Sequence, residues 1–261
     1  MTTDALFRID GLVKRFGGLL ATDHVTLAIA PGEVHALIGP NGAGKTTLIH
    51  QITGLLKPDA GRLWLAGRDI TALADHQRVA AGLSRCFQVT RVFARNTVQD
   101  NLVLALQAHA GSSLRFFAPR TREAGLYAQA RELAARVGLD QVLSREAGTL
   151  PHGAQRTLDV ALALAAKPRL LLLDEPMAGM GPEESARMVE LIESLRGNDG
   201  ERCAVLLVEH DMDAVFRLAD RVTVLVQGRV LTTGTVDAVR ADARVQAVYL
   251  GAEDIATEPA P

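Results

Sequence analysis

The residues with the clearest chemical potential form a glycine-rich segment, GPNGAGKT, which begins at Gly39 and ends at Thr46. It fits the phosphate-loop pattern G-x-x-x-x-G-K-[ST] and lies between an expected strand and an expected helix. In such a loop, backbone N–H groups point into one concavity, and the positive end of the following helix attracts phosphate. We expect Lys45 to neutralise the β- and γ-phosphates and the Thr46 hydroxyl to coordinate Mg²⁺. The predicted nucleotide-binding set in this segment is Gly39, Pro40, Asn41, Gly42, Ala43, Gly44, Lys45, Thr46 and Thr47.

A second chemical signal is the apolar run LLLLDEP, which starts at Leu170 and contains two adjacent carboxylates. A strand that ends in Asp-Glu is, by itself, more often the start of a solvated loop. The phosphate-loop pattern, whose Lys45 lies 129 positions before Asp174, makes a ligand-binding role the favoured interpretation, because open α/β sheets bind ligands at the carboxyl ends of their strands. The pattern predicts that Asp174 holds Mg²⁺ and that Glu175 orients and deprotonates the attacking water.

Two further polar residues end expected strands. His210 ends the segment AVLLVEH and could donate a hydrogen bond to the γ-phosphate, although a histidine there is more often structural. Gln88 ends SRCFQ, and its amide could complete the metal coordination or hold the water. Alone, Gln88 is uninformative, and the order and spacing of all the motifs make both residues candidates. The predicted catalytic set is therefore Lys45, Glu175 and His210, and the predicted metal set is Thr46, Gln88 and Asp174.

The hydrophobic pattern indicates the elements that would position these residues in the first two thirds of the chain. Segments 25–29 and 34–38 flank a Pro-Gly turn and are expected to form paired strands. Segments 62–67 and 84–88 are expected to form two further strands. From about residue 90 to 165 the apolar spacing predicts a helical insert. One predicted helix face carries Leu126, Ala130, Leu133 and Val137.

Beyond Pro168, strands and helices are expected to alternate, with a turn at Gln227-Gly228 before the last strand. Such alternation predicts an α/β fold whose sheet is mainly parallel and covered by helices on both faces. The last eleven residues, 251–261, are acidic and rich in alanine and proline, so we expect a loose tail.

Composition limits the class of protein. The 261 residues include 28 Lys+Arg and 30 Asp+Glu, a net charge of −2, which argues against a polybasic nucleic-acid binder. The longest apolar runs are much shorter than the roughly 20 residues of a membrane-spanning helix, and the charged amino terminus does not resemble a signal peptide, so we expect a cytoplasmic chain. Cys86 and Cys203 suggest neither a disulfide framework nor a zinc site, and both are expected to be buried.

The ordered set GPNGAGKT, Gln88, LPHGAQR, LLLLDEP and EHDM resembles the ATP-binding subunit of an ABC transporter over nearly the whole chain. The phrases FGGL, MAGMGPEE and VQAVYLG are similar to the branched-chain or hydrophobic amino-acid uptake branch. The resemblance implies a P-loop NTPase (RecA-like) α/β core with an antiparallel β subdomain and an inserted α-helical subdomain. In these terms, one ABC cassette comprises a core of residues 1–88 and 167–250, a helical subdomain of residues 89–166 and the tail.

The same resemblance implies a head-to-tail dimer that holds two ATP molecules between one subunit's phosphate loop and the other's signature segment. Phe16 matches the aromatic residue that stacks on adenine, and the alternative is a core phenylalanine. The signature segment here is Leu150, Pro151, His152, Gly153 and Ala154.

This signature departs from the family's pattern, which begins Leu-Ser-Gly-Gly-Gln or Leu-Ser-His-Gly-Glu. Pro151 replaces a serine that would cap the next helix and reach the partner's γ-phosphate, a charge-assisted bond of about 1.5–3 kcal/mol. Ala154 removes a polar side chain, and Gly181 stands where many relatives carry an aspartate of the intersubunit loop. These departures suggest an asymmetric heterodimer with a second ATP-binding subunit, with a homodimer as the alternative.

The function implied is ATP hydrolysis that powers import of a small solute, such as a branched-chain or other hydrophobic amino acid, through separate membrane permease subunits. The chain would lie on the inner face of the plasma membrane, and an external substrate-binding protein would act indirectly. Residues 89–96 would line the groove for the permeases, or form an ordinary connector. Alternatives are an ATP-binding switch with little hydrolysis, an importer of urea, amides or aromatic acids, and a soluble ABC ATPase acting on ribosomes or DNA.

Overall fold

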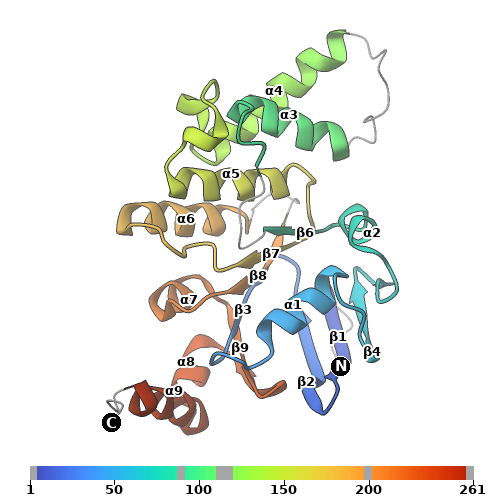
Figure 1. The fold of residues 1–261 in the computed structure, drawn as a ribbon, viewed down its shortest axis with the longest axis vertical. Helices are drawn as coiled ribbons and strands as arrows, with labels where there is room; N and C mark the ends of the chain where they lie inside the picture. Colours follow the sequence, from blue (N-terminus) through green and yellow to red (C-terminus); the bar gives the residue numbers. More distant parts are fainter. Residues whose placement is uncertain (1–4, 87–91, 110–119, 197–201, 257–261) are drawn as a thin grey trace.

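The structure is a computed structural model that describes residues 5–86, 92–109, 120–196 and 202–256. Six strands within these ranges form a mixed sheet in the order β10-β9-β3-β8-β7-β6, in which β10 alone pairs antiparallel (Figure 1). Their bounds are β3 (Val34–Ile38), β6 (Leu83–Cys86), β7 (Leu170–Asp174), β8 (Ala204–Val208), β9 (Arg221–Val226) and β10 (Arg229–Gly234). The predicted α/β fold with a mainly parallel sheet is confirmed.

A second sheet is antiparallel and has the order β2-β1-β4-β5. Its strands are β1 (Phe7–Phe16), β2 (Leu19–Ile29), β4 (Ala60–Leu65) and β5 (Arg68–Asp69). The expected pairing of segments 25–29 and 34–38 is therefore wrong, because β2 pairs with β1 whereas β3 lies between β8 and β9. Most of β2 alternates between buried and exposed residues, whereas every residue of β3 is buried, so β3 takes a central position in the parallel sheet.

Helices cover both faces of the mixed sheet. Figure 1 shows α5, α6 and α7 on one side and α1 with the antiparallel sheet on the other. The helices are α1 (Lys45–Thr53), α2 (Asp75–Ala80), α3 (Val98–His109), α4 (Arg120–Arg136), α5 (His152–Leu164), α6 (Pro182–Ser194), α7 (Met212–Leu218), α8 (Val236–Ala241) and α9 (Ala243–Ala256). Two short 3₁₀ turns, η1 (Asp140–Val142) and η2 (Ala147–Thr149), precede α5. Within the described ranges, no helix is both long and apolar enough to cross a lipid bilayer.

Alternate residues of the central strands feed two separate hydrophobic clusters. Leu171 and Leu173 of β7 pack with the helical side of the molecule, whereas Leu170 and Leu172 pack with α1 and the antiparallel sheet. All four leucines are fully buried, and each contributes about 1.5–3 kcal/mol relative to an exposed side chain. A strand buried on both faces is therefore held firmly, and its carboxyl end is a rigid support for Asp174.

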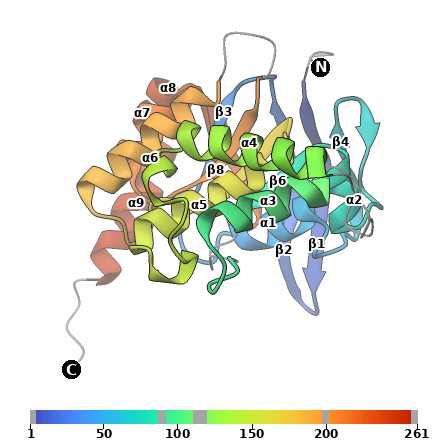
Figure 2. The ribbon, with the colours of Figure 1, turned by 90° about the horizontal axis from the view of Figure 1, so that it is seen from above.

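Between β6 and β7, the described elements are helical. Figure 2 shows α3 and α4 side by side, in front of α5 in this view. The predicted helix face is confirmed, because Ala130 of α4 is fully buried, and Leu126, Leu133 and Val137, the residue after the end of α4, pack in the same cluster.

Two other expectations concern the cysteines and the C-terminal tail. Cys86 and Cys203 are free and buried, as expected, and burial raises the pKa of Cys203 to about 11. The expected start of the loose tail at residue 251 is wrong, because α9 continues to Ala256. Residues 257–261 lie outside the described part of the chain.

Candidate functional site

The glycine-rich loop connects the end of β3 to the start of α1, and two of its glycines are required by close approach of backbone atoms. At Gly39 (φ +154°), an added Cβ would lie 2.1 Å from the carbonyl oxygen of Leu225. At Gly44 (φ +99°), it would lie 2.3 Å from the carbonyl oxygen of Ala21. Only glycine combines these dihedral angles with this proximity, so the loop is held tightly against its neighbours.

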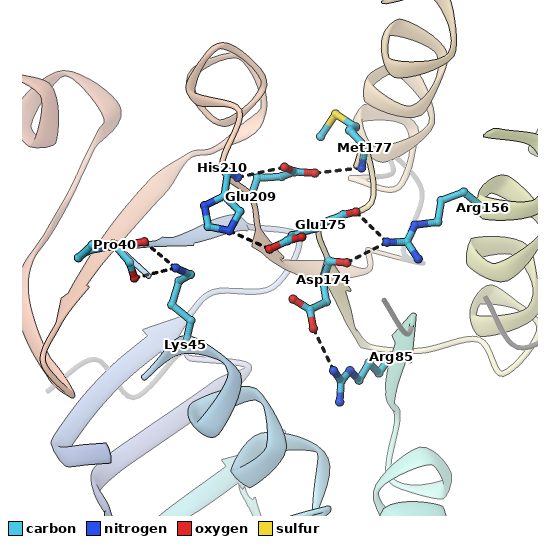
Figure 3. A network of polar contacts seen from close by, with 10 residues as sticks. Pro40, Lys45, Arg85, Arg156, Asp174, Glu175, Met177, Glu209 and His210 are labelled. Carbon is cyan, nitrogen blue, oxygen red and sulfur yellow. Dashed lines mark hydrogen bonds and ion pairs between the residues drawn. The ribbon is translucent and has the colours of Figure 1, made fainter. Parts of the chain in front are cut away.

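Lys45 begins α1, and its side chain lies along the loop. Its Nζ donates hydrogen bonds to the carbonyl oxygens of Gly39, at 2.5 Å, and Pro40, at 3.1 Å (Figure 3). Burial lowers the pKa of Lys45, and the negative charges of Glu175 and Asp174 act in the opposite direction. The two carboxylates favour the charged form of the Lys45 ammonium group, which can bind an anionic ligand that lies over the loop.

The remaining residues of the predicted nucleotide-binding set differ in how far they are exposed to solvent. The side chain of Ala43 packs in the core, whereas Thr46 is exposed on the first turn of α1. Asn41 and Gly42 are exposed, and Pro40, Gly44 and Thr47 are partly buried. The hydroxyl of Thr46 is therefore accessible next to Lys45.

The two predicted carboxylates lie at the carboxyl end of β7, where Asp174 ends the strand and Glu175 follows it. Glu175 adopts φ +50°, a left-handed conformation that costs a non-glycine residue of order 1–3 kcal/mol. Its N–H donates to the carbonyl oxygen of Val208 at 2.8 Å, and its carbonyl accepts from Arg156 Nη2 at 2.8 Å. These two contacts hold the backbone of Glu175 in this conformation.

Figure 3 shows that the structure brings together His210 and Glu175, two members of the predicted catalytic set. His210 Nε2 lies 2.8 Å from Glu175 Oε1, and both side chains are partly exposed. His210 follows Glu209, whose carboxylate accepts hydrogen bonds from the N–H groups of Met177, at 3.0 Å, and His210, at 3.1 Å. Glu209 therefore holds the backbone of His210 and of the loop after β7, while the imidazole contacts Glu175.

Glu209 is buried, and sequence reasoning missed it. Burial raises the pKa of Glu209, and the backbone hydrogen bonds that its carboxylate accepts act in the opposite direction. Its contact with Met177 joins the end of β8 to the loop after β7. The available signal was the position of Glu209, a charged residue directly after the apolar strand β8.

Two arginines at this site were also missed. Arg156 of α5 donates to the backbone carbonyls of Asp174 and Glu175, and Arg85 of β6 forms an ion pair with the Asp174 side chain. Arg156 ends the LPHGAQR motif, but local sequence does not show which group either arginine contacts, because both contacts join different segments of the chain. Gln88, the third predicted metal ligand, lies outside the described residues.

The C-terminal helix also approaches the loop. Tyr249 of α9 packs in the cluster that contains Ile38 of β3. Burial raises the pKa of Tyr249, whereas a hydrogen bond with the backbone of Gly39 acts in the opposite direction. The phrase VQAVYLG therefore contributes a residue next to the glycine-rich loop.

The predicted signature segment forms the start of α5. Leu150 is buried, and Pro151 is the N-cap residue and provides no side-chain hydrogen bond to the helix. A Cβ on Gly153 would lie 2.3 Å from the carboxyl carbon of Glu184 on α6, so a larger residue there would require the Glu184 side chain to move. His152 and Ala154 are exposed and partly buried respectively.

Phe16, the predicted adenine-stacking residue, ends β1 and is 49% exposed. The alternative of a core phenylalanine is therefore wrong. Lys14 Nζ lies 5.7 Å from the centroid of its ring. An exposed aromatic ring is available to stack on a planar group.

Comparisons with known proteins agree along the chain. The family described as "ABC transporter" matches residues 22–178, and "Branched-chain amino acid ATP-binding cassette transporter" matches residues 229–255. The chain is 38% identical over 253 residues to "High-affinity branched-chain amino acid transport ATP-binding protein BraF" of Pseudomonas aeruginosa, covering 94% of this chain and 98% of that protein. Identity and coverage are the same for the protein LivG of Escherichia coli, which has the same description.

A solved structure extends the similarity to the fold. The ADP conformation of an ATP-binding cassette of an ABC transporter superposes with a TM-score of 0.83 at 28% identity. The match covers 95% of this chain and 100% of that one.

Proposed function

The chain belongs to the ABC transporter ATP-binding family, and on that premise we propose that it hydrolyses ATP to power import of branched-chain or other hydrophobic amino acids. The observation that carries the hydrolytic part is the Glu175–His210 contact of 2.8 Å beside the loop that holds Lys45. The substrate class is supported by the names of the BraF and LivG relatives and by the match of residues 229–255. An importer of urea or amides is the alternative.

The residues have these roles in the proposed reaction. The backbone N–H groups of the loop and the Lys45 ammonium bind the β- and γ-phosphates. Glu175 accepts a proton from a water whose oxygen attacks the γ-phosphorus, and the bond between that phosphorus and the ADP oxygen breaks. The Nε2–H of His210, which contacts the Glu175 carboxylate in this structure, is the donor that we assign to the γ-phosphate when ATP is bound. The products are ADP and inorganic phosphate.

Mg²⁺ fits the oxygen atoms present at this site. Asp174 already pairs with a cationic group, and the Thr46 hydroxyl is exposed near the phosphate loop. Mg²⁺ prefers oxygen ligands and is commonly held by one or two side chains together with phosphates, and when bound it would neutralise charge on the phosphates. We assign Thr46 and Asp174 as its protein ligands, with Gln88 as a third candidate.

Membrane permease subunits are the proposed partners of the helical lobe, residues 89–166. A groove of about 400 Å³ there is lined by Phe93, Asn101, Leu104, Ala105, Gln107, Ala108 and Leu162. Phe93 is 64% exposed, and its backbone N–H and carbonyl are both hydrogen-bonded to Asn101. An exposed aromatic ring on a firmly held backbone is suited to receive a short helix of a partner.

Uptake by reconstituted vesicles tests this function. With the permease subunits and external binding protein present, ATP should drive uptake of labelled leucine, and unlabelled leucine but not urea should compete. We expect Phe93→Asp to abolish uptake and co-purification of the permeases, because a charge in the groove would lose its solvation on docking. Thermal unfolding of this variant should match that of the wild type.

Tyr127→Asp is the matched control, since Tyr127 is a large exposed side chain on α4 outside the groove. It should leave leucine uptake intact. Uptake of urea in place of leucine would support the alternative substrate class, and full uptake by Phe93→Asp would contradict the proposed docking site.

A second ATP-binding subunit is the other proposed partner, because Pro151 leaves the start of α5 without a side-chain cap. We expect Pro151→Ser to raise the unfolding free energy by about 0.5–2 kcal/mol, since serine is a good N-cap residue. We also expect it to strengthen dimerisation of the chain with a non-hydrolysable ATP analogue, measured by sedimentation. Pro151→Ala, which removes proline without adding a cap, should do neither. A wild-type homodimer in which both sites turn over equally would contradict the asymmetric heterodimer.

A further inference from the structure

The Asp174 side chain is already occupied by a cation from the protein itself. Arg85 Nη2 lies 2.9 Å from Asp174 Oδ2, and the two side chains are only 9% and 12% exposed. The contact is set by strand register, because β6 and β7 are parallel and Arg85 is paired with Leu172, two residues before Asp174. Both groups therefore come from rigid strands and not from loops.

This ion pair lies in a region rich in charge. His50 of α1 is close enough to both partners to be affected by their charges. Burial lowers the pKa of His50 most. The positive charge of Arg85 also lowers this pKa, whereas the negative charge of Asp174 raises it. A buried carboxylate without a cation would lose its hydration with little compensation. In the absence of metal, Arg85 therefore supplies charge compensation that a divalent ion would otherwise provide.

The contact involves one carboxylate oxygen. Figure 3 shows the other oxygen of Asp174 directed away from Arg85, toward the side of the site where Lys45 lies. A metal ion bound there would share the carboxylate with the guanidinium group. The metal ion and the guanidinium group are both positive and would repel each other, and solvent screens this repulsion little in a partly buried site.

We propose that Arg85 is a positioning residue that competes with Mg²⁺ for the Asp174 carboxylate and thereby weakens metal binding in the nucleotide complex. The proposal rests on the function proposed above. It follows from linkage: removing Arg85 destabilises the metal-free state more than the metal-bound state, so metal affinity must rise by the corresponding factor.

The test is metal affinity, measured independently of turnover. Mn²⁺ serves as the probe, and its binding to the chain in complex with a non-hydrolysable ATP analogue is followed by electron paramagnetic resonance. We expect Arg85→Met to tighten Mn²⁺ binding at least fivefold, to lower the unfolding temperature without metal, and to regain most of that loss when Mn²⁺ and the analogue are added. Arg85→Lys, which keeps the charge, should stay within about twofold of wild type.

Arg187→Met is the control, because Arg187 is exposed on α6 and its ion pair with Glu183 lies on the surface. It should not change Mn²⁺ affinity. If Arg85→Met does not fold, Arg85→Gln replaces it with the same expectation. Unchanged or weaker Mn²⁺ binding in the neutral variant, with normal binding in the wild type, would overturn the role of Arg85 alone. Failure of the wild type to bind the analogue and Mn²⁺ would instead overturn the proposed function and, with it, this inference.

Discussion

Glu175→Gln is expected to lower steady-state ATP hydrolysis by about 10²- to 10⁴-fold, the usual contribution of a positioned general base. Glutamine has nearly the same shape, and its amide oxygen can still accept the hydrogen bond from His210, now 2.8 Å from Glu175 Oε1. It cannot accept a proton from water. ATP affinity should therefore remain within a few fold of wild type, and the measurement is turnover and ATP binding on the same preparations.

Glu183→Gln is the matched control for this loss. Glu183 is a carboxylate on α6 whose side chain is 92% exposed, so its replacement should leave turnover unchanged. Substantial turnover by Glu175→Gln would contradict the assignment of the general base. Tight ATP binding by the wild type, with negligible turnover even beside a partner subunit that carries an intact signature, would favour the ATP-binding switch.

Gly39→Ala is expected to weaken ATP binding by at least about 100-fold, because one methyl group cannot be placed without moving the loop. Its Cβ would lie 2.1 Å from the carbonyl oxygen of Leu225, a backbone atom of β9. Displacement of the loop would misalign its N–H groups, and each charge-assisted hydrogen bond lost costs about 1.5–3 kcal/mol. Isothermal titration with a non-hydrolysable ATP analogue measures the effect.

Gly67→Ala separates steric conflict from the general cost of a positive φ. Gly67 has φ +78° and lies in a turn where an added Cβ would meet no atom within 4 Å. We expect it to cost about 1–2 kcal/mol of stability and to leave ATP affinity unchanged. If Gly39→Ala binds the analogue as tightly as Gly67→Ala does, the contact with β9 does not constrain the loop.

The phosphate loop could be predicted because its chemistry is contiguous. The pattern from Gly39 to Thr46 contains its own turn residues, cation and hydroxyl, and neighbouring strands add only the close contacts at Gly39 and Gly44. The run that ends in Asp174 and Glu175 was equally informative, since an unbroken apolar strand must be buried and its carboxyl end must reach the ligand-binding edge of the sheet.

Pairing of strands was less predictable. Segments 25–29 and 34–38 flank a tight turn, yet β2 and β3 belong to different sheets. The turn permits a hairpin, but β3 buries all five residues and gains more between β8 and β9 than beside β2. Competition between distant partners, which local spacing does not represent, determined that outcome.

By itself, the sequence determined the glycine-rich loop, the acidic strand end, the α/β class and the family. Tertiary structure alone decided which side chains hold those groups in place. Arg85 reaches Asp174 across 89 positions of sequence, and Arg156 reaches the carbonyl of Glu175 across 19. Such contacts depend on how β6 aligns with β7 and how α5 packs beside them, because hydrogen bonds and ion pairs form only over a few ångströms and that geometry exists only once the sheet has assembled.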